Sequence, residues 1–109
     1  MNYQEAIRFG AAEYADVIQA LWQAGYRTSF TQTGGMCAAL EVRLETGASL
    51  LITDADDTLS WDRIDHRGWA VGMYPPENEY DGEALAFRQT DRSDIDGLLS
   101  LISYVLAAA

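Results

Sequence analysis

The chain has 109 residues and a mass of 12.0 kDa, which suits one α+β domain over residues 1–109 and excludes multidomain organisation. Apolar residues make up 49% and charged residues 22%, so the composition is that of a folded protein rather than a disordered one. Seventeen acidic residues face seven basic ones. This balance disfavours direct binding to nucleic acid or to anionic membranes, because both require Lys and Arg to neutralise phosphates.

The sequence predicts a cytoplasmic protein without a membrane span. Residues 1–8 lack the basic start and apolar stretch of a secretory signal, because Glu5 interrupts that pattern. The longest apolar run, residues 98–109, contains two serines and is shorter than the roughly 20 residues that cross a bilayer. The single cysteine, Cys37, cannot form an internal disulfide, which agrees with a reducing compartment.

The first half of the chain predicts one helix followed by three strands. Apolar residues recur at helical spacing over residues 3–24, and Gly25 supplies the stop, although Gly10 weakens the first turns. Period-two alternation then predicts strands over residues 26–31, 38–45 and 48–53. Glycine-containing turns separate these strands.

The second half predicts a long loop, two strands and a final helix. Residues 54–68 have no sustained period and predict a loop with a helical turn near residues 61–66. Strands follow over residues 69–74 and 83–89, with an acidic loop between them. Ser93 and Asp96 form a variant capping box before a helix whose last three alanines are expected to fray. The order predicts an antiparallel meander of four to five strands, with an N-terminal and a C-terminal helix packed on one face.

Three segments resemble small proteins of actinobacteria and their phages: GGMCAALEVRL (34–44), LLITD (50–54) and DRIDHRGWAVGMY (62–74). The resemblance spans most of the chain, and the use of arginine in place of lysine throughout is typical of a GC-rich genome. It implies an actinobacterial or phage setting. Because those proteins have no assigned activity, it implies no catalytic residues.

The negative charge is concentrated in one part of the chain. Twelve of the seventeen acids lie within residues 54–96, together with four of the seven arginines. This pattern predicts an electronegative loop face, over residues 54–65 and 77–83, that docks a basic protein and could imitate a phosphate backbone. The alternative is a solvated surface that keeps a small protein soluble. The candidate partner-binding residues are Asp56, Asp57, Trp61, Asp62, Arg63, Arg67, Trp69, Glu77, Glu79 and Asp81.

Residues 61–69 combine two tryptophans, two arginines, two aspartates and the only histidine. Trp and Arg are enriched at binding hot spots, so a partly exposed segment of this kind predicts a contact surface. In the alternative, Trp61 and Ile64 fold the loop back over the sheet edge. Arg63 and Arg67 then pair with neighbouring aspartates, which contributes little at a surface.

A metal site is the competing functional hypothesis. Asp54, Asp56 and Asp57 are close enough in sequence to share a divalent cation, and His66 would complete a small metal-binding or metal-assisted hydrolytic domain. The calcium-loop motif is incomplete, however, because the expected glycine and glutamate are missing from residues 58–60 and beyond. The alternative is a turn whose aspartates bind backbone amides. We therefore expect no cofactor, no resident metal and no catalytic residues.

Three further features carry weaker signals. Cys37, His66 and a neighbouring aspartate could serve as nucleophile, base and orienter, but a cysteine among small apolar residues is expected to be a buried, inert thiol. The sheet face without helices could pair with a second copy as a homodimer. The C-terminal alanines could form a degradation tag or a frayed helical turn.

Overall fold

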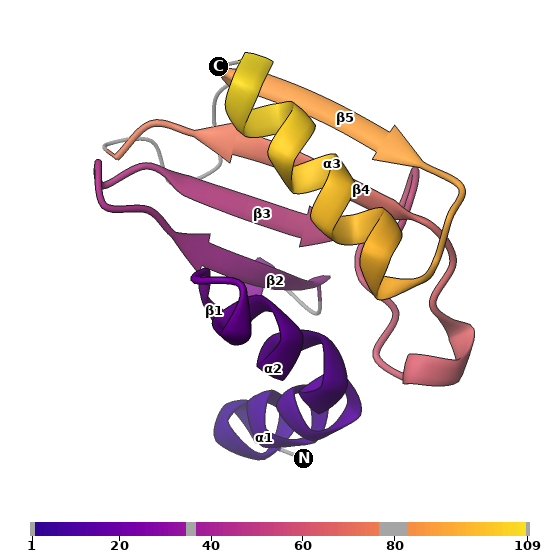
Figure 1. The fold of residues 1–109 in the computed structure, drawn as a ribbon. Helices are drawn as coiled ribbons and strands as arrows, with labels where there is room; N and C mark the ends of the chain where they lie inside the picture. The colour runs from indigo at the N-terminus through magenta and orange to yellow at the C-terminus, as the bar shows by residue number, and fades with distance from the viewer. Residues whose placement is uncertain (1, 35–36, 77–82, 109) are drawn as a thin grey trace.

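The computed structural model describes residues 2–34, 37–76 and 83–108, and it confirms the predicted α+β fold (Figure 1). A five-stranded sheet has the order β1-β2-β3-β4-β5, and each neighbouring pair is antiparallel. The strands are β1 (Arg27–Gly34), β2 (Cys37–Arg43), β3 (Ser49–Thr53), β4 (Trp69–Tyr74) and β5 (Ala86–Thr90). The helices are α1 (Tyr3–Glu13), α2 (Ala15–Gln23) and α3 (Ile95–Ala108), and a short 3-10 helix, η1, spans Arg63–Asp65.

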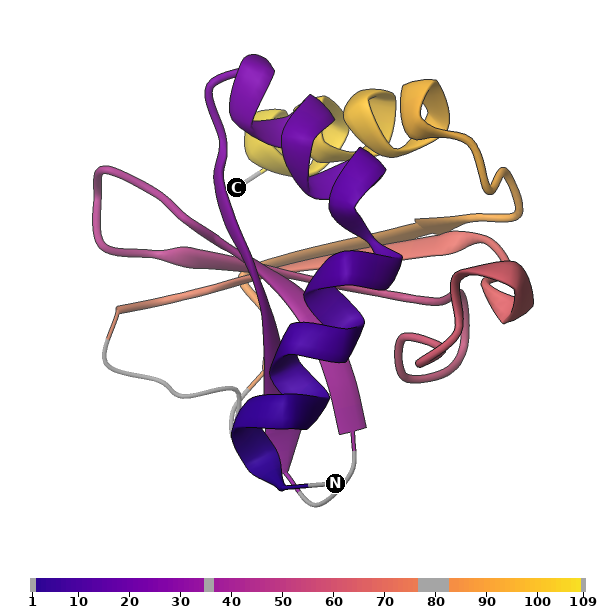
Figure 2. The ribbon, with the colours of Figure 1, turned by 90° about the horizontal axis from the view of Figure 1, so that it is seen from below.

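All three helices pack on one face of the sheet. A row of directly paired residues crosses this face and consists of Phe30, Leu40, Ile52, Val71 and Arg88. At one edge the Phe30 ring stacks on Tyr14, which joins α1 to α2, with 6.2 Å between ring centroids. At the other edge the Arg88 guanidinium lies 4.3 Å from the ring centre of Tyr104 in α3. Figure 2 accordingly shows α2 and α3 on the same side of the sheet.

The hydrophobic core lies between the helices and this face of the sheet. Leu21 of α2 and Ile102 of α3 are fully buried in it. The alternating side chains of the central strands, such as Leu50 and Ile52, are equally buried. Each such side chain stabilises the fold by about 1.5–3 kcal/mol. The period-two pattern therefore correctly predicts the core-facing residues of β3, whereas Leu85 and Phe87, the large apolar side chains of the last predicted strand, are exposed.

The prediction of one helix over residues 3–24 is wrong, because the helix is interrupted at Tyr14. This residue has φ of −105° and ψ of 21°, outside helical values, and separates α1 from α2. Its side chain is completely buried, and its hydroxyl donates a hydrogen bond to the carbonyl of Ser60, 46 residues away. The interruption is set by this tertiary contact, which hydrophobic spacing does not reveal. The predicted stop at Gly25 is confirmed, with a φ of 93°.

Gly10 lies within α1 and permits the helix to approach the sheet. A Cβ atom at this position would lie 2.1 Å from the ring of Phe30. Phe30 is itself 5% exposed and packed between aromatic neighbours, so its ring has little room to move. The glycine that weakens the helix in the sequence is therefore required by packing.

Several predicted boundaries shift in the structure. The last strand begins at Ala86 rather than at residue 83. Asp94, rather than Ser93, immediately precedes α3, and its carboxylate pairs with the Arg92 guanidinium at 2.7 Å. The Ser93 hydroxyl instead accepts a hydrogen bond from the N–H of Gly68, at 2.7 Å. The capping prediction therefore located the helix start within two residues but assigned the wrong side chain.

Two terminal and surface predictions also change. Cys37 is exposed at the start of β2, so the expectation of a buried thiol is wrong. α3 continues through Ala108, so the predicted fraying is not observed at residues 107 and 108, and Ala109 lies outside the described residues. The predicted acidic loop at residues 77–82 also lies outside the described residues.

Among the helices that the structure describes, none has the length and apolar character needed to cross a membrane.

Substitution Gly10→Ala is expected to lower the free energy of unfolding by about 1–3 kcal/mol, because the added methyl group overpacks the Phe30 ring. Urea denaturation measures this loss. The double variant Gly10→Ala with Phe30→Leu is the control, because a smaller side chain relieves the clash and makes the two effects non-additive. Strict additivity of the two single effects would contradict this packing.

Candidate functional site

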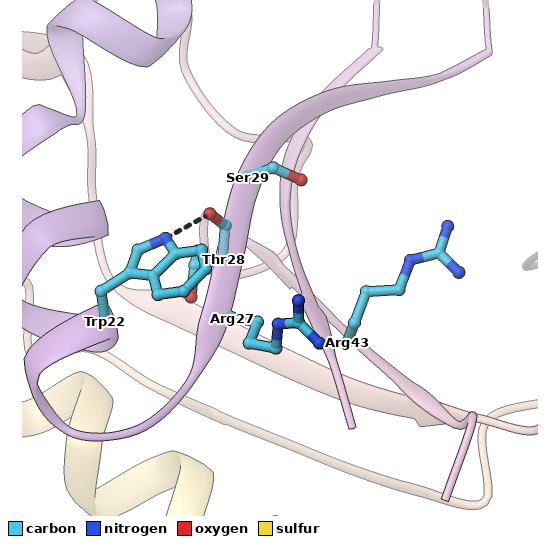
Figure 3. A pocket seen from close by; sticks show the side chains of 5 residues that line it. All are labelled: Trp22, Arg27, Thr28, Ser29 and Arg43. Atoms are coloured by element: carbon cyan, nitrogen blue, oxygen red, sulfur yellow. Dashed lines mark hydrogen bonds between the residues drawn. The ribbon is translucent and has the colours of Figure 1, made fainter. Parts of the chain in front are cut away.

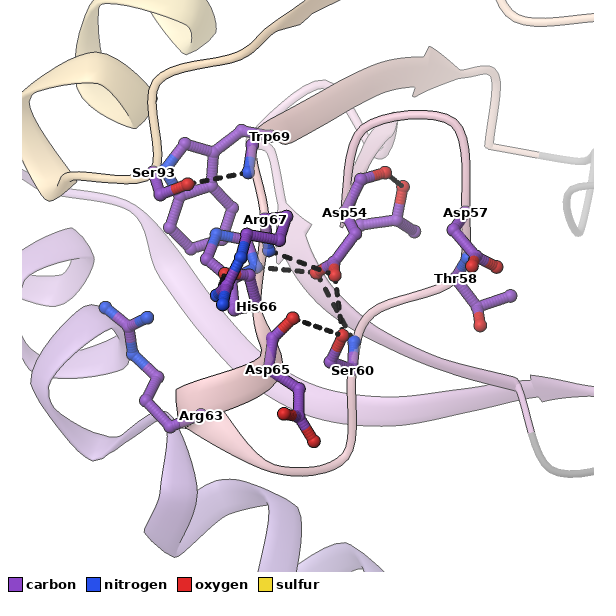
Figure 4. Close-up of polar contacts among 12 residues, drawn as sticks. Asp54, Asp57, Thr58, Ser60, Arg63, Asp65, His66, Arg67, Trp69 and Ser93 are labelled. Carbon is purple, nitrogen blue, oxygen red and sulfur yellow. Dashed lines mark hydrogen bonds and ion pairs between the residues drawn. The ribbon is translucent and has the colours of Figure 1, made fainter.

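The loop between β3 and β4, residues 54–68, is organised around one buried carboxylate. Asp54 follows β3 and is 5% exposed. Its oxygens accept hydrogen bonds from the Ser60 hydroxyl at 2.6 Å, the Ser60 N–H at 3.3 Å and the Arg67 N–H at 3.2 Å. They also contact Nδ1 of His66 at 2.5 Å (Figure 4). Four contacts from both halves of the loop therefore converge on one side chain.

His66 is a neutral core residue in this arrangement. Its side chain has no exposed surface and packs against Trp69, with ring centroids 3.8 Å apart. Burial lowers the pKa of His66 below 6.5, against the opposing effect of the Asp54 carboxylate. Nδ1 then carries the proton and donates a hydrogen bond to the Asp54 carboxylate, which leaves Nε2 unprotonated. Nε2 is buried and has no hydrogen-bond partner within the described residues, so it is not positioned to act as a general base on a solvent-borne substrate.

The loop is also tied to the two N-terminal helices. The Tyr14 hydroxyl donates to the Ser60 carbonyl at 2.6 Å, and burial raises the pKa of this phenol, so it remains a donor. The N–H of Arg63 donates to Glu13 at 2.9 Å, and the Arg63 guanidinium lies 3.3 Å from Asp16. These contacts hold η1 against the α1–α2 junction.

Further contacts fix the first and last parts of the loop. Asp56, at a φ of 60°, exchanges two hydrogen bonds with the side chain of Gln89 in β5, at 3.1 and 2.8 Å. Aspartate tolerates this left-handed backbone better than most residues. The N–H of Leu59 donates to the carbonyl of Ala38 in β2 at 3.0 Å. The loop is therefore attached to the sheet as well as to the helices.

Exposed carboxylates surround this loop and the neighbouring start of α3. The Gly68–Ser93 hydrogen bond and the pairing of Trp69 with Thr90 bring the two segments to one end of the sheet (Figure 1). We call the exposed carboxylates at this end the acidic end: Asp56, Asp57, Asp62, Asp65, Asp91, Asp94 and Asp96.

One large apolar side chain is exposed at the acidic end. Ile64, in η1, is 82% exposed, whereas Trp61 beside it is half-buried with its ring 5.3 Å from that of Phe30. The suggestion that Ile64 folds back over the sheet is therefore wrong, while Trp61 does anchor the loop. The Arg67 guanidinium donates to two carbonyls of the same loop, at Ile64 and His66, rather than to an aspartate.

The other predicted contact residues have different positions. Trp69 is completely buried and its indole N–H donates to the carbonyl of Asp94 at 2.9 Å, so it presents no exposed surface to a partner in this structure. Glu77, Glu79 and Asp81 lie outside the described residues.

The alternative metal site of Asp54, Asp56, Asp57 and His66 is not assembled in the described part of the chain. Asp54 and His66 contact each other, Asp56 is held by Gln89, and the Asp57 carboxylate accepts from the N–H of Thr58. Within residues 2–34, 37–76 and 83–108, no group of three or more His, Cys, Asp or Glu side chains is arranged to hold a metal ion.

The roles of Ser60 and Tyr14 have no signal in the sequence. The Tyr14 hydroxyl bonds to the Ser60 carbonyl and the Ser60 hydroxyl to Asp54, and no local spacing in the sequence indicates either contact.

Comparison with known proteins finds no matching family model, no matching curated protein and no matching solved structure. A functional assignment therefore depends on the geometry of the site, and the resemblance to actinobacterial and phage proteins stays a prediction.

Substitution Asp54→Asn is expected to lower the free energy of unfolding by about 2–4 kcal/mol, because an amide has one acceptor oxygen and cannot satisfy every donor that meets Asp54. The matched control is Asp57→Asn, at an exposed position of the same loop, which should change stability by less than about 0.5 kcal/mol. Urea denaturation compares the two variants. Equal effects would contradict the organising role of Asp54.

His66 is expected to make stability depend on pH near neutrality. Above pH 6.5 neither the folded nor the unfolded state protonates this histidine, so the slope is flat. Below that value the unfolded state binds a proton that the folded state resists, and the free energy of unfolding falls by up to about 1.4 kcal/mol per pH unit. Because His66 is the only histidine, the variant His66→Gln should lack this slope between about pH 7 and 5.5. Stability that rises on acidification would contradict a lowered pKa.

Proposed function

We propose that this protein is a non-enzymatic interaction protein that binds a basic protein through the acidic end, with Ile64 as its apolar anchor. The observation that carries the proposal is the 82% exposure of Ile64 on a loop whose backbone is fixed by the buried Asp54 carboxylate. A small domain that fixes a loop by so many contacts, and then exposes an isoleucine side chain on it, offers the features of a contact surface.

The rigidity of the loop favours binding. Association loses affinity when a loop must be ordered at the interface, and a loop held in place beforehand avoids this cost. The Asp54 contacts, the Tyr14–Ser60 hydrogen bond and the Asp56–Gln89 pair hold both sides of η1. Ile64 and its neighbours are therefore presented in one geometry rather than many.

The charge at this end supports a basic partner. Its seven exposed aspartates are accompanied by three arginines, of which Arg63 pairs with Asp16 and Arg92 with Asp94. The remaining negative charge attracts a basic surface over a distance of about a Debye length, which speeds association and selects against acidic competitors. An apolar anchor within a charged rim then provides the short-range contact.

We further propose that the protein works in the cytoplasm of an actinobacterial host or of a cell carrying its phage. The single cysteine supports a reducing compartment, and the sequence resemblance supports the host.

The metal-assisted hydrolase is the less favoured function, because Asp54 and His66 are engaged with each other in the core. A homodimer would use the sheet face that bears the exposed Phe87, and light scattering of the purified protein distinguishes it from a monomer.

The test is capture of basic proteins from an actinobacterial lysate by the immobilised protein at low and at high salt. The native protein should retain a basic protein at low salt and release it at high salt. Two variants separate the components: Asp57→Asn with Asp62→Asn removes two exposed charges of the acidic end, and Ile64→Ser removes the apolar anchor. Both should lose the same captured protein.

The matched control is Glu5→Gln with Glu45→Gln, which removes two exposed charges elsewhere on the surface. This variant should retain the captured protein. Retention by the native protein and by all three variants alike would contradict the proposal, as would a complex that is indifferent to salt.

A further inference from the structure

A second surface feature lies at the opposite end of the sheet. A shallow pocket of about 320 Å³ is lined by Trp22, Arg27, Thr28, Ser29 and Arg43, and we call it the arginine pocket (Figure 3). Its strand residues lie at the start of β1 and the end of β2. The end of β4 lies at the same end of the sheet, because Arg43 pairs with Ser49 and Ser49 pairs with Tyr74. The acidic end lies where β4 begins, so the two surfaces are separated by the length of the strands.

The pocket brings two arginines together, and one of them, Arg43, is paired with Glu41. Arg27 and Arg43 are direct partners across the antiparallel β1–β2 pair, so their side chains leave the same face of the sheet. Like charges directly opposite each other destabilise a sheet. A direct pair of arginines is unexpected in this chain, because it has only seven arginines and a net charge of −10.

Neighbouring acids compensate this charge only in part. Glu41 lies 3.2 Å from Arg43, whose side chain is nevertheless 72% exposed. The Arg27 side chain makes no ion pair or hydrogen bond with the part of the chain that the structure describes. An anion bound between the two guanidinium groups would remove the repulsion, because arginine recognises phosphate and carboxylate through paired N–H donors.

Trp22 lines the same pocket from the outer edge of β1. Trp22, in the last turn of α2, donates its indole N–H to the carbonyl of Thr28 at 2.9 Å. This bond fixes the plane of the ring against the edge of β1, as Figure 3 shows, while the side chain stays about half exposed. A fixed and exposed indole is a stacking surface for a planar ring, and such stacking tolerates any nucleobase.

We propose that the arginine pocket binds a mononucleotide, with the phosphate against Arg27 and Arg43 and the base against Trp22. A phosphate can accept hydrogen bonds from both guanidinium groups, and the Ser29 hydroxyl lines the same pocket as an additional donor. The volume is at the lower end of the roughly 300–1,000 Å³ of ligand pockets, which suits one nucleotide. The net charge of the chain disfavours longer polyanions.

The test is calorimetric titration of the purified protein with adenosine 5′-monophosphate at low salt. We expect saturable binding with a Kd of about 1 mM or tighter, and weaker binding of adenosine alone and of inorganic phosphate alone. Arg27→Gln, Arg43→Gln and Trp22→Leu should each weaken binding by about tenfold or more. Arg8→Gln is the matched control, because it removes the same charge from an exposed position of α1 outside the pocket, and it should bind as the native protein does.

Each contrary result overturns the proposal in a defined way. No saturable binding of the nucleotide overturns the site itself. Equal loss in Arg8→Gln and Arg27→Gln shows nonspecific attraction to positive charge, and phosphate alone binding as tightly as the nucleotide removes the role of Trp22. Arg27 and Arg43 are both exposed, so their substitution is expected to leave the fold intact, which circular dichroism checks.

Discussion

The buried carboxylate of Asp54 is the interaction on which the long loop depends. A carboxylate in the core is strongly unfavourable unless hydrogen bonds replace the water it loses. Ser60, His66 and Arg67 provide these bonds from three positions along the loop. Because the donors are distributed along the chain, satisfying one charge fixes the path of a segment whose regular structure is otherwise limited to the single turn of η1 and the bridge of Leu59 to β2.

The same contacts connect the core to the exposed surface. Tyr14 interrupts the N-terminal helix, packs on Phe30 and holds the Ser60 carbonyl, so helix geometry and loop geometry are set together. The loop in turn carries Ile64 outward among the aspartates of the acidic end. In a domain of 109 residues, this sequence of contacts explains how an irregular segment can present a fixed surface. It also explains why Trp69, although part of a hot-spot-like sequence, supports that surface from within.

The sequence predicts the sheet better than the loop. Alternation in β2 and β3 correctly identifies the core-facing residues, because that signal is local and has a period of two. The break at Tyr14 and the donor role of Ser60 depend on contacts across 46 residues and have no local signal. Trp61 and Trp69 both lie in a segment whose composition is typical of binding hot spots. Trp69, however, is the first residue of β4 and its side chain is buried in the core. The pairing of Arg27 with Arg43 could not be predicted from the sequence, because it depends on the register between β1 and β2.

We expect the loop of residues 54–68 to be rigid in the free protein, because the contacts of Asp54 fix its path. Backbone ¹⁵N relaxation of the native protein measures this directly, and Ile64 reports on the exposed turn while Arg67 reports on the Asp54 contacts. The account predicts order parameters near 0.85 across the loop, about the value of rigid backbone in strands. Values below about 0.6 around Ile64 would contradict it, because a mobile loop presents no fixed surface.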